Sequence, residues 1–153
     1  MSSFALDIRR FVEKTKDRAD QAVHTIVANI AAEIDFRSPV GDATYWKSPP
    51  PKGYVGGRFR ANWQLGVGSV DVATTMATDR SPKNRETGGT TTRGIVASIP
   101  AQAAGKVYYL SNSLPYAQRI ENGWSRQAPS GVVGLTQVMF QQIVRKAIAE
   151  LPE

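Results

Sequence analysis

The sequence predicts an α+β fold in which a long N-terminal helix and a C-terminal helix pack on a small, mainly antiparallel β-sheet, with two long loops. Apolar residues recur every three or four positions from Phe4 to Ile34, which is the period of an amphipathic helix. The same period returns from Met139 to Leu151. Between these segments, Arg60 to Val67 alternates polar and apolar side chains, as a strand with one buried face does. Helices at the ends and strands in the middle are typical of the α+β class.

The first helix is longer than a domain of this size can cover along one side. A helix rises ~1.5 Å per residue, so the segment from Phe4 to Ile34 is about 45 Å long. We therefore expect part of it to pack on a neighbouring molecule. Ser2 or Ser3 is the expected N-cap. The helix should end before Pro39, because the residue before a proline is pushed out of the helical region.

Further strands are expected after the first. The segments Arg93–Ile99 and Lys106–Leu110 are rich in β-branched and aromatic residues, and turn residues join them. Val70–Thr75 is a candidate extension of the first strand, and Gly131–Leu135 is a candidate for another. The sheet is therefore predicted to be small and antiparallel.

Two helix boundaries can be predicted near the C-terminus. A short helix is expected from Pro115 to Glu121, with the proline at its first position and Gly123 just beyond its end. Thr136 is the expected cap of the last helix. Lys146 lies near the end of that helix, where a cation complements the helix dipole.

Length and composition fit a single domain over residues 1–153. The chain is 41% hydrophobic and 21% charged, close to the average for globular domains. Two stretches, 43–57 and 79–93, are dense in proline, glycine and charge, which disfavours regular structure. We expect the first to be an inserted arm and the second a flexible loop, both of which become ordered in an assembly.

Composition argues against most enzyme chemistry. The chain has no cysteine, which excludes disulfides, thiolate metal sites and cysteine nucleophiles. His24 is the only imidazole and lies inside the first helix, and no phosphate-binding Gly-x-x-x-x-Gly-Lys-Ser/Thr sequence occurs. Asp35, Asp42 and Glu121 could meet in a metal-dependent hydrolase, but nothing in their spacing selects them. We therefore expect no catalytic, metal or cofactor site.

The net charge of +6 is compatible with a polyanionic partner. Most of the excess lies between residues 36 and 93, which carry nine basic and four acidic side chains. Aromatic residues lie among these basic ones, a pattern typical of nucleic-acid surfaces. The members of this pattern are eight of the nine basic residues, Lys47, Lys52, Arg58, Arg60, Arg80, Lys83, Arg85 and Arg93, with the aromatic residues Tyr45, Trp46 and Tyr54. A nucleic-acid-binding accessory protein is thus one hypothesis, although the same charges also suit an acidic protein partner.

Two short strings are the most specific features of the sequence. The first is Ser38-Pro-Val-Gly-Asp42, which resumes after an insertion as Gly57-Arg-Phe-Arg-Ala-Asn-Trp63. The second runs from Leu114 to Gly131 and contains Pro-Tyr-Ala and Glu-Asn-Gly-Trp. Together with the long first helix, they resemble the tail-completion proteins of long-tailed bacteriophages, which are also called neck or tail-to-head joining proteins. The chain departs from the usual pattern by the insertion between Asp42 and Arg58.

The resemblance implies a structural virion protein that is not an enzyme. Such a protein would form a homo-oligomeric ring, most often a hexamer, at the phage neck. Its partners would be a head connector or stopper protein and a tail-tube or tail-terminator protein, with DNA passing through the lumen without sequence-specific binding. It would assemble in the host cytoplasm and need no membrane. In agreement, the longest uncharged run, 127–144, contains Pro129 and two glycines and does not resemble a membrane span.

Several residues are candidates for contacts between subunits or between rings. A lumen that bound phosphates strongly would hinder DNA passage, so the basic residues of the second loop are expected mainly at protein contacts. Trp63 and Trp124 suit either a core or an interface, because tryptophan dominates both kinds of burial. The full set of candidates is Arg58, Arg60, Trp63, Arg80, Lys83, Arg85, Arg93, Tyr116, Glu121 and Trp124.

Overall fold

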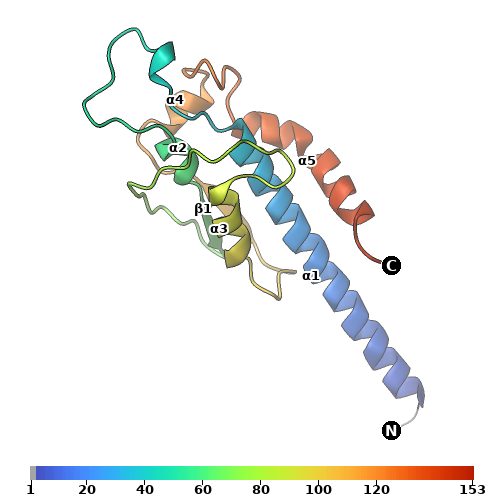
Figure 1. Cartoon of the computed structure of the whole chain (residues 1–153). Coiled ribbons are helices and arrows are strands. Elements are labelled where there is room, and N and C mark those ends of the chain that lie inside the picture. Colours follow the sequence, from blue (N-terminus) through green and yellow to red (C-terminus); the bar gives the residue numbers. More distant parts are fainter. Residues whose placement is uncertain (1–2) are drawn as a thin grey trace.

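One helix, α1 (Ser3–Arg37), runs the length of the molecule, and the rest of the chain is built around its C-terminal half (Figure 1). The computed structural model describes residues 3–153. The later elements are η1 (Ala43–Tyr45), α2 (Arg58–Ala61), β1 (Gln64–Val67), α3 (Thr90–Ser98), β2 (Tyr108–Ser111), α4 (Ala117–Glu121) and α5 (Val133–Ala149). The α+β class is confirmed. Of the two expected caps of α1, Ser2 lies outside the described residues and Ser3 is already helical.

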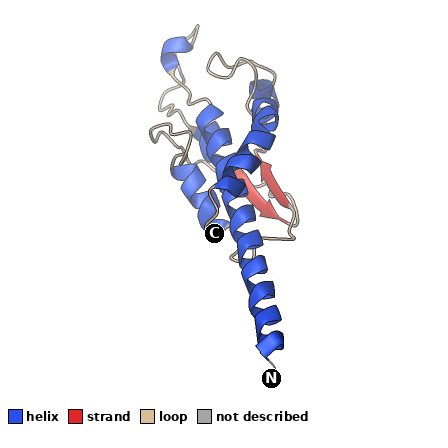
Figure 2. Cartoon of the chain, turned by 90° about the vertical axis from the view of Figure 1, so that its right-hand side faces the viewer, coloured by secondary structure: helices blue, strands red, loops and turns tan. Residues whose placement is uncertain are grey.

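The sheet has two antiparallel strands and lies beside α1 (Figure 2). β1 pairs with β2 in a register that places Gln64 opposite Ser111 and Val67 opposite Tyr108. The strand predicted at Lys106–Leu110 is thus confirmed as β2, which begins at Tyr108 and ends at Ser111. α5 packs along α1 on another side.

The core forms where α1, α2, α3 and the segment before α5 converge. Its larger cluster surrounds Phe59 and Trp63, whose rings meet edge to face with centroids 5.6 Å apart. The other buried members are Ala31, Ile34, Ile95, Leu114, Ala128 and Val132. A smaller cluster joins Val27, Ile99 and Ala103. The buried part of α1 therefore begins near Val27.

The strand predicted over Arg60–Val67 is wrong in its first half. Residues 58–61 form α2, and the strand begins only at Gln64. The alternation had placed Arg60 and Asn62 on a polar outer face, whereas both are buried. Asn62 explains the difference, because its amide nitrogen donates to the carbonyl of Arg58 at 2.7 Å and its amide oxygen accepts from the backbone of Thr75 at 2.7 Å. These bonds close the helical turn and hold the 70–75 segment, which was predicted as a strand, as irregular chain.

The strand predicted over Arg93–Ile99 is also wrong, because this segment belongs to α3. Thr92, Ile95 and Ile99 are buried and follow a helical spacing. The β-branched residues form a helix here because two distant carboxylates, those of Asp35 and Asp79, accept its first backbone N–H groups.

Near the C-terminus, the predicted short helix is confirmed as α4, although it begins two residues after Pro115. Gly123 follows it with a positive φ of 84°, the conformation that ends many helices at glycine. The strand predicted over Gly131–Leu135 is wrong, since α5 starts at Val133. Thr136 does not cap α5 either. It lies inside the helix and its hydroxyl donates to the carbonyl of Val132 at 2.9 Å.

Candidate interaction surfaces

The N-terminal part of α1 projects beyond the rest of the molecule (Figures 1 and 2). We call residues 5–19 the projecting segment, and every one of them is exposed. Five of its apolar and small residues nevertheless share one stripe along the helix, made of Ile8, Phe11, Val12, Thr15 and Ala19, whereas Leu6 lies on the other side. The Phe11 side chain, for example, is 71% exposed. The eight charged residues of the segment all lie outside this stripe.

The inserted loop, residues 43–57, folds back on its own base. Asp42 caps η1 by accepting from the backbone N–H and the hydroxyl of Thr44, at 2.9 and 2.8 Å. These bonds lower the pKa of Asp42 below its usual value. At the other end, a Cβ added to Gly56 would lie 2.0 Å from the carbonyl oxygen of Gly41. The two ends of the loop thus approach so closely that only a glycine fits.

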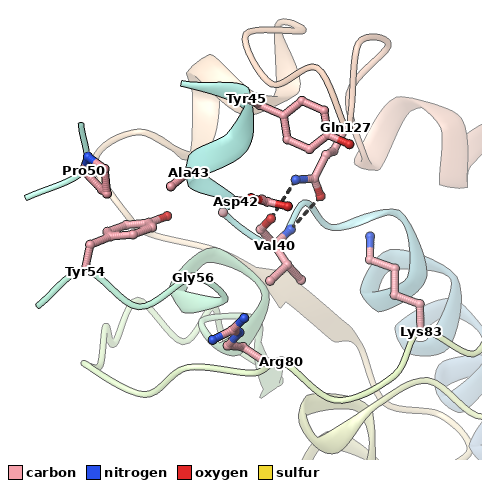
Figure 3. A pocket seen from close by; sticks show the side chains of 11 residues that line it. Val40, Asp42, Ala43, Tyr45, Pro50, Tyr54, Gly56, Arg80, Lys83 and Gln127 are labelled. Carbon is pink, nitrogen blue, oxygen red and sulfur yellow. Dashed lines mark hydrogen bonds between the residues drawn. The ribbon is translucent and has the colours of Figure 1, made fainter. Parts of the chain in front are cut away.

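A hollow of about 760 Å³ lies between the inserted loop and the loop that carries Arg80 and Lys83 (Figure 3). Gln127 closes one side, with its side-chain amide making two hydrogen bonds to the backbone of Val40 at 2.7 and 3.1 Å. Lys83 donates from Nζ to the carbonyl of Ser38 at 2.6 Å. Partial burial, and then the nearby Arg60 guanidinium, lower the pKa of Lys83. The sequence candidates Arg80 and Lys83 therefore meet at this hollow.

A second hollow, of about 420 Å³, is lined by aromatic rings and arginines. Trp46 and Tyr54 of the inserted loop have ring centroids 4.7 Å apart and form one wall. Tyr116 and Trp124 come from the region of α4, and the Arg119 guanidinium lies over the Trp124 ring, 5.2 Å from its centroid. Trp124 is 74% exposed. Of Trp63 and Trp124, whose role the sequence left undecided, Trp124 is therefore the residue at the surface.

The other sequence candidates at this hollow lie deeper. Burial raises the pKa of the half-buried Tyr116. Arg58 donates from Nε to the carbonyl of Thr75 at 3.1 Å. Trp63, by contrast, is only 6% exposed, and its indole N–H donates to the Ser38 hydroxyl at 2.8 Å. The structure thus places Trp63 in the core, which answers one of the questions that the sequence left open.

Arg60, a predicted contact residue, is completely buried, at 0% exposure. Its Nε donates to the carboxylate of Asp35 on α1, and its Nη1 lies 3.6 Å from the carboxylate of Asp79. Nη1 also donates to the carbonyl of Ser81 at 2.5 Å. Burial tends to raise the pKa of Asp79, but hydrogen bonds from Ser81 and Thr91 hold it well below its usual value. Arg60 therefore fixes the interior of the subunit and is not part of its surface.

The remaining basic candidates lie on the outside. Arg85 stacks over the Phe36 ring at 4.5 Å and lies 3.6 Å from the carboxylate of Glu33. Arg93 donates to the hydroxyl of Thr90 at 2.9 Å. Arg80, Arg85 and Arg93 are all exposed. The loop predicted over 79–93 ends before Thr90, where α3 begins, so Arg93 lies on a helix. The flexibility of this loop stays a prediction.

Glu121 caps the start of α5, although it lies 11 to 13 positions before the residues whose N–H groups it binds. Its carboxylate accepts the backbone N–H groups of Val132, Val133 and Gly134 at 2.9, 2.9 and 2.8 Å. Burial tends to raise the pKa of Glu121, but these three bonds lower it overall. Sequence analysis missed this cap because the spacing is not that of a local capping box.

The three carboxylates considered for a hydrolase serve separate structural roles. Asp35 binds Arg60, Asp42 caps η1, and Glu121 caps α5. Among residues 3–153, no group of three or more histidine, aspartate or glutamate side chains is placed to hold a metal ion. The same part of the chain contains no helix long and apolar enough to cross a membrane.

Comparison of the chain with protein-family models, with curated proteins and with solved structures found no match. The surfaces described above are therefore interpreted from their own geometry and from the sequence resemblance.

Proposed function

We propose that this chain is a structural protein of the bacteriophage neck, where copies of it form a ring, most simply a hexamer, between the head connector and the tail tube. The observation that carries the proposal is the projecting segment of α1. The resemblance of the two sequence strings to tail-completion proteins supplies the place in the virion. In this role the chain has no catalytic task.

The projecting segment supports an oligomer on physical grounds. Its stripe exposes Ile8, Phe11 and Val12 together, whereas apolar side chains on a monomer's surface are normally scattered. A helix stabilised by tertiary packing needs a partner for its apolar face. Residues 8–19 are all exposed in the subunit, so a second molecule is the natural source of that partner.

A ring requires two different, complementary surfaces on each subunit. The projecting segment lies at one end of the molecule, and the two hollows lie near the inserted loop at the other (Figure 1). The hollows therefore suit contacts to a neighbouring ring, whereas the projecting segment suits a contact to another copy of the chain. In this arrangement Arg80, Lys83, Arg85 and Arg93 serve protein contacts, and DNA passes through the lumen without being held.

The proposal can be tested in a phage that encodes the chain. A stop codon early in its gene should leave filled heads and complete tails that accumulate separately in electron micrographs. The wild-type chain supplied from a plasmid should restore joined particles, as should Arg10→Gln. Phe11→Gln should restore far fewer, because it alters the apolar stripe and not the charged side of the same segment.

Joined particles in the absence of the chain would contradict the proposal. The nucleic-acid hypothesis makes a different prediction for the combined replacement of Arg80, Lys83, Arg85 and Arg93 by serine. If that variant assembles normally but loses a strongly salt-dependent affinity for duplex DNA, the accessory-protein function is favoured instead.

A further inference from the structure

α5 carries a second apolar face that the subunit leaves uncovered. Its core-facing side buries Thr136, Ile143 and Ala147 against the rest of the subunit. On the neighbouring side, Val133 and Phe140 are exposed and Val144 is half-buried. Val138, further round the helix, is 79% exposed.

The exposed side of α5 also lacks charge over its first three turns. No charged residue occurs from 127 to 144. A helix side that faces water normally carries charged residues. A side that is exposed, apolar and uncharged has the composition of an interface core. Both the projecting segment and α5 therefore present faces that are suited to burial.

The two faces have the same spacing. On the projecting segment the stripe positions Ile8, Val12, Thr15 and Ala19 follow steps of four, three and four. On α5 the positions Val133, Gln137, Phe140 and Val144 follow the same steps. This is the alternation that lets two helices pack with interlocking side chains along a common seam. Each seam covers about 17 Å of helix, so the two match in length as well.

We propose that the projecting segment of one subunit packs antiparallel against α5 of a second copy of this chain. This inference rests on the proposed ring, because it names the pair of surfaces that would join neighbouring subunits. The contact joins two different faces, so it can propagate from copy to copy and close into a ring. The pairs are Ile8 with Val144, Val12 with Phe140, Thr15 with Gln137 and Ala19 with Val133.

Polarity favours the antiparallel direction. In this direction the only two polar members, Thr15 and Gln137, face each other. The Thr15 hydroxyl donates to the carbonyl of Phe11 at 2.8 Å in its own helix, so its oxygen can accept a hydrogen bond from the Gln137 amide. In the parallel direction Gln137 would face Val12 and have no such partner. A buried amide without a partner is costly, so the parallel alignment is disfavoured.

The helix dipoles favour the same direction. The antiparallel alignment places the positive N-terminal end of α1 beside the negative C-terminal end of α5.

The absence of cysteine from the chain makes disulfide cross-linking a direct test. Ile8→Cys and Val144→Cys would be made on separate full-length chains, mixed in equal amounts and oxidised. We expect a covalent dimer that contains one copy of each variant. The control mixes Ala19→Cys with Val144→Cys, the pair that only a parallel contact would join, and should cross-link at least about tenfold more slowly. Circular dichroism would check that each variant keeps its fold.

A chain that carries both Ile8→Cys and Val144→Cys should give a ladder of oligomers that ends in a closed ring. A ladder that stops at a closed dimer would keep the contact but contradict the proposed ring. A ring observed by mass photometry with no Ile8–Val144 cross-link would overturn the contact and leave the neck function standing. Faster cross-linking of Ala19→Cys with Val144→Cys, or of Ile8→Cys with itself, would also overturn it. So would a chain that stays monomeric at 200 µM, in which case the stop-codon phenotype decides the function separately.

Discussion

Arg60 and Asp35, separated by 25 positions in the sequence, form an ion pair that is buried from solvent on both sides. The pair joins α2 to α1. Through the second oxygen of Asp35, which accepts from the backbone of Gly89 at 2.7 Å and the hydroxyl of Thr92 at 2.5 Å, it also joins the start of α3. Three segments of the fold therefore meet at one carboxylate.

We expect Arg60→Ala to destabilise the subunit by about 3 to 5 kcal/mol, because removing one partner leaves the other charge buried and uncompensated. Chemical denaturation followed by circular dichroism measures the change. Arg80→Ala is the matched control, since Arg80 is exposed, and should change the free energy of unfolding by less than about 0.5 kcal/mol. Similar losses for both variants would contradict the assignment of Arg60 to the interior.

The two sequence strings that resemble tail-completion proteins place their tryptophans in opposite environments, and this gives a second prediction. Trp63→Ala should cost about 3 to 5 kcal/mol, because it empties a packed site and leaves the Ser38 hydroxyl without its donor. Trp124→Ala should leave the free energy of unfolding nearly unchanged. Thermal melts of both variants compare them directly. A Trp63→Ala variant that melts like the wild type would remove Trp63 from the core.

The cap that Glu121 supplies to α5 predicts a dependence on pH. The pKa of this carboxyl is lower in the folded chain than its ordinary 4.5, so its ionised form stabilises the fold. That contribution is present above pH 4.5 and disappears as the pH falls through the lowered pKa. Glu121→Gln should therefore destabilise by about 1 kcal/mol at pH 7 and by much less at an acidic pH below the lowered pKa. Urea titrations at both pH values measure the difference, and a constant difference would contradict it.

The inserted loop provides a prediction for limited proteolysis. Lys47 and Lys52 lie in a stretch that is exposed at every position from 42 to 55, whereas the Lys83 ammonium is bound to the Ser38 carbonyl. Trypsin should therefore cut the free subunit first after Lys47 or Lys52, and the assembled protein more slowly. Mass spectrometry of the early fragments identifies the sites. Equal rates for free and assembled protein would argue against ordering of the loop on assembly.

The parts of the fold with a regular period could be predicted from the sequence. α1 and the body of α5 are long enough for their apolar positions to repeat several times, so the pattern identifies each helix without knowledge of the rest. The length of α1 alone predicted that part of it extends beyond the subunit, but not which part. The strand at Tyr108–Ser111 was found because aromatic and β-branched residues are concentrated there.

The errors occur where distant side chains decide local structure. Residues 93–99 read as a strand, yet Asp79 and Asp35 turn them into the body of a helix by binding its first N–H groups. The start of α5 was misplaced for the same reason, since its cap comes from Glu121. None of these three carboxylates lies within the few residues that a local pattern can examine.

The candidate contact residues show the same limit. Residue type alone identified Arg60 and Arg80 equally, because both are arginines in a basic stretch. The structure separates them by their acidic neighbours, since Arg60 lies between Asp35 and Asp79 and Arg80 is exposed. Trp63 and Trp124 were likewise equivalent in the sequence and are separated only by packing.

α1 contains neither proline nor glycine, so it has none of the residues at which helices commonly kink. It is a stiff rod that begins in the projecting segment and ends, inside the body, at the carboxylate of Asp35. Tilting of its free end would therefore not be absorbed along the way. The motion would reach the residues anchored to Asp35, which include Gly89 and the first turn of α3, and through them the loop that bears Arg80 and Lys83. A tilt of α1 at the projecting segment would in this way alter the position of the basic loop.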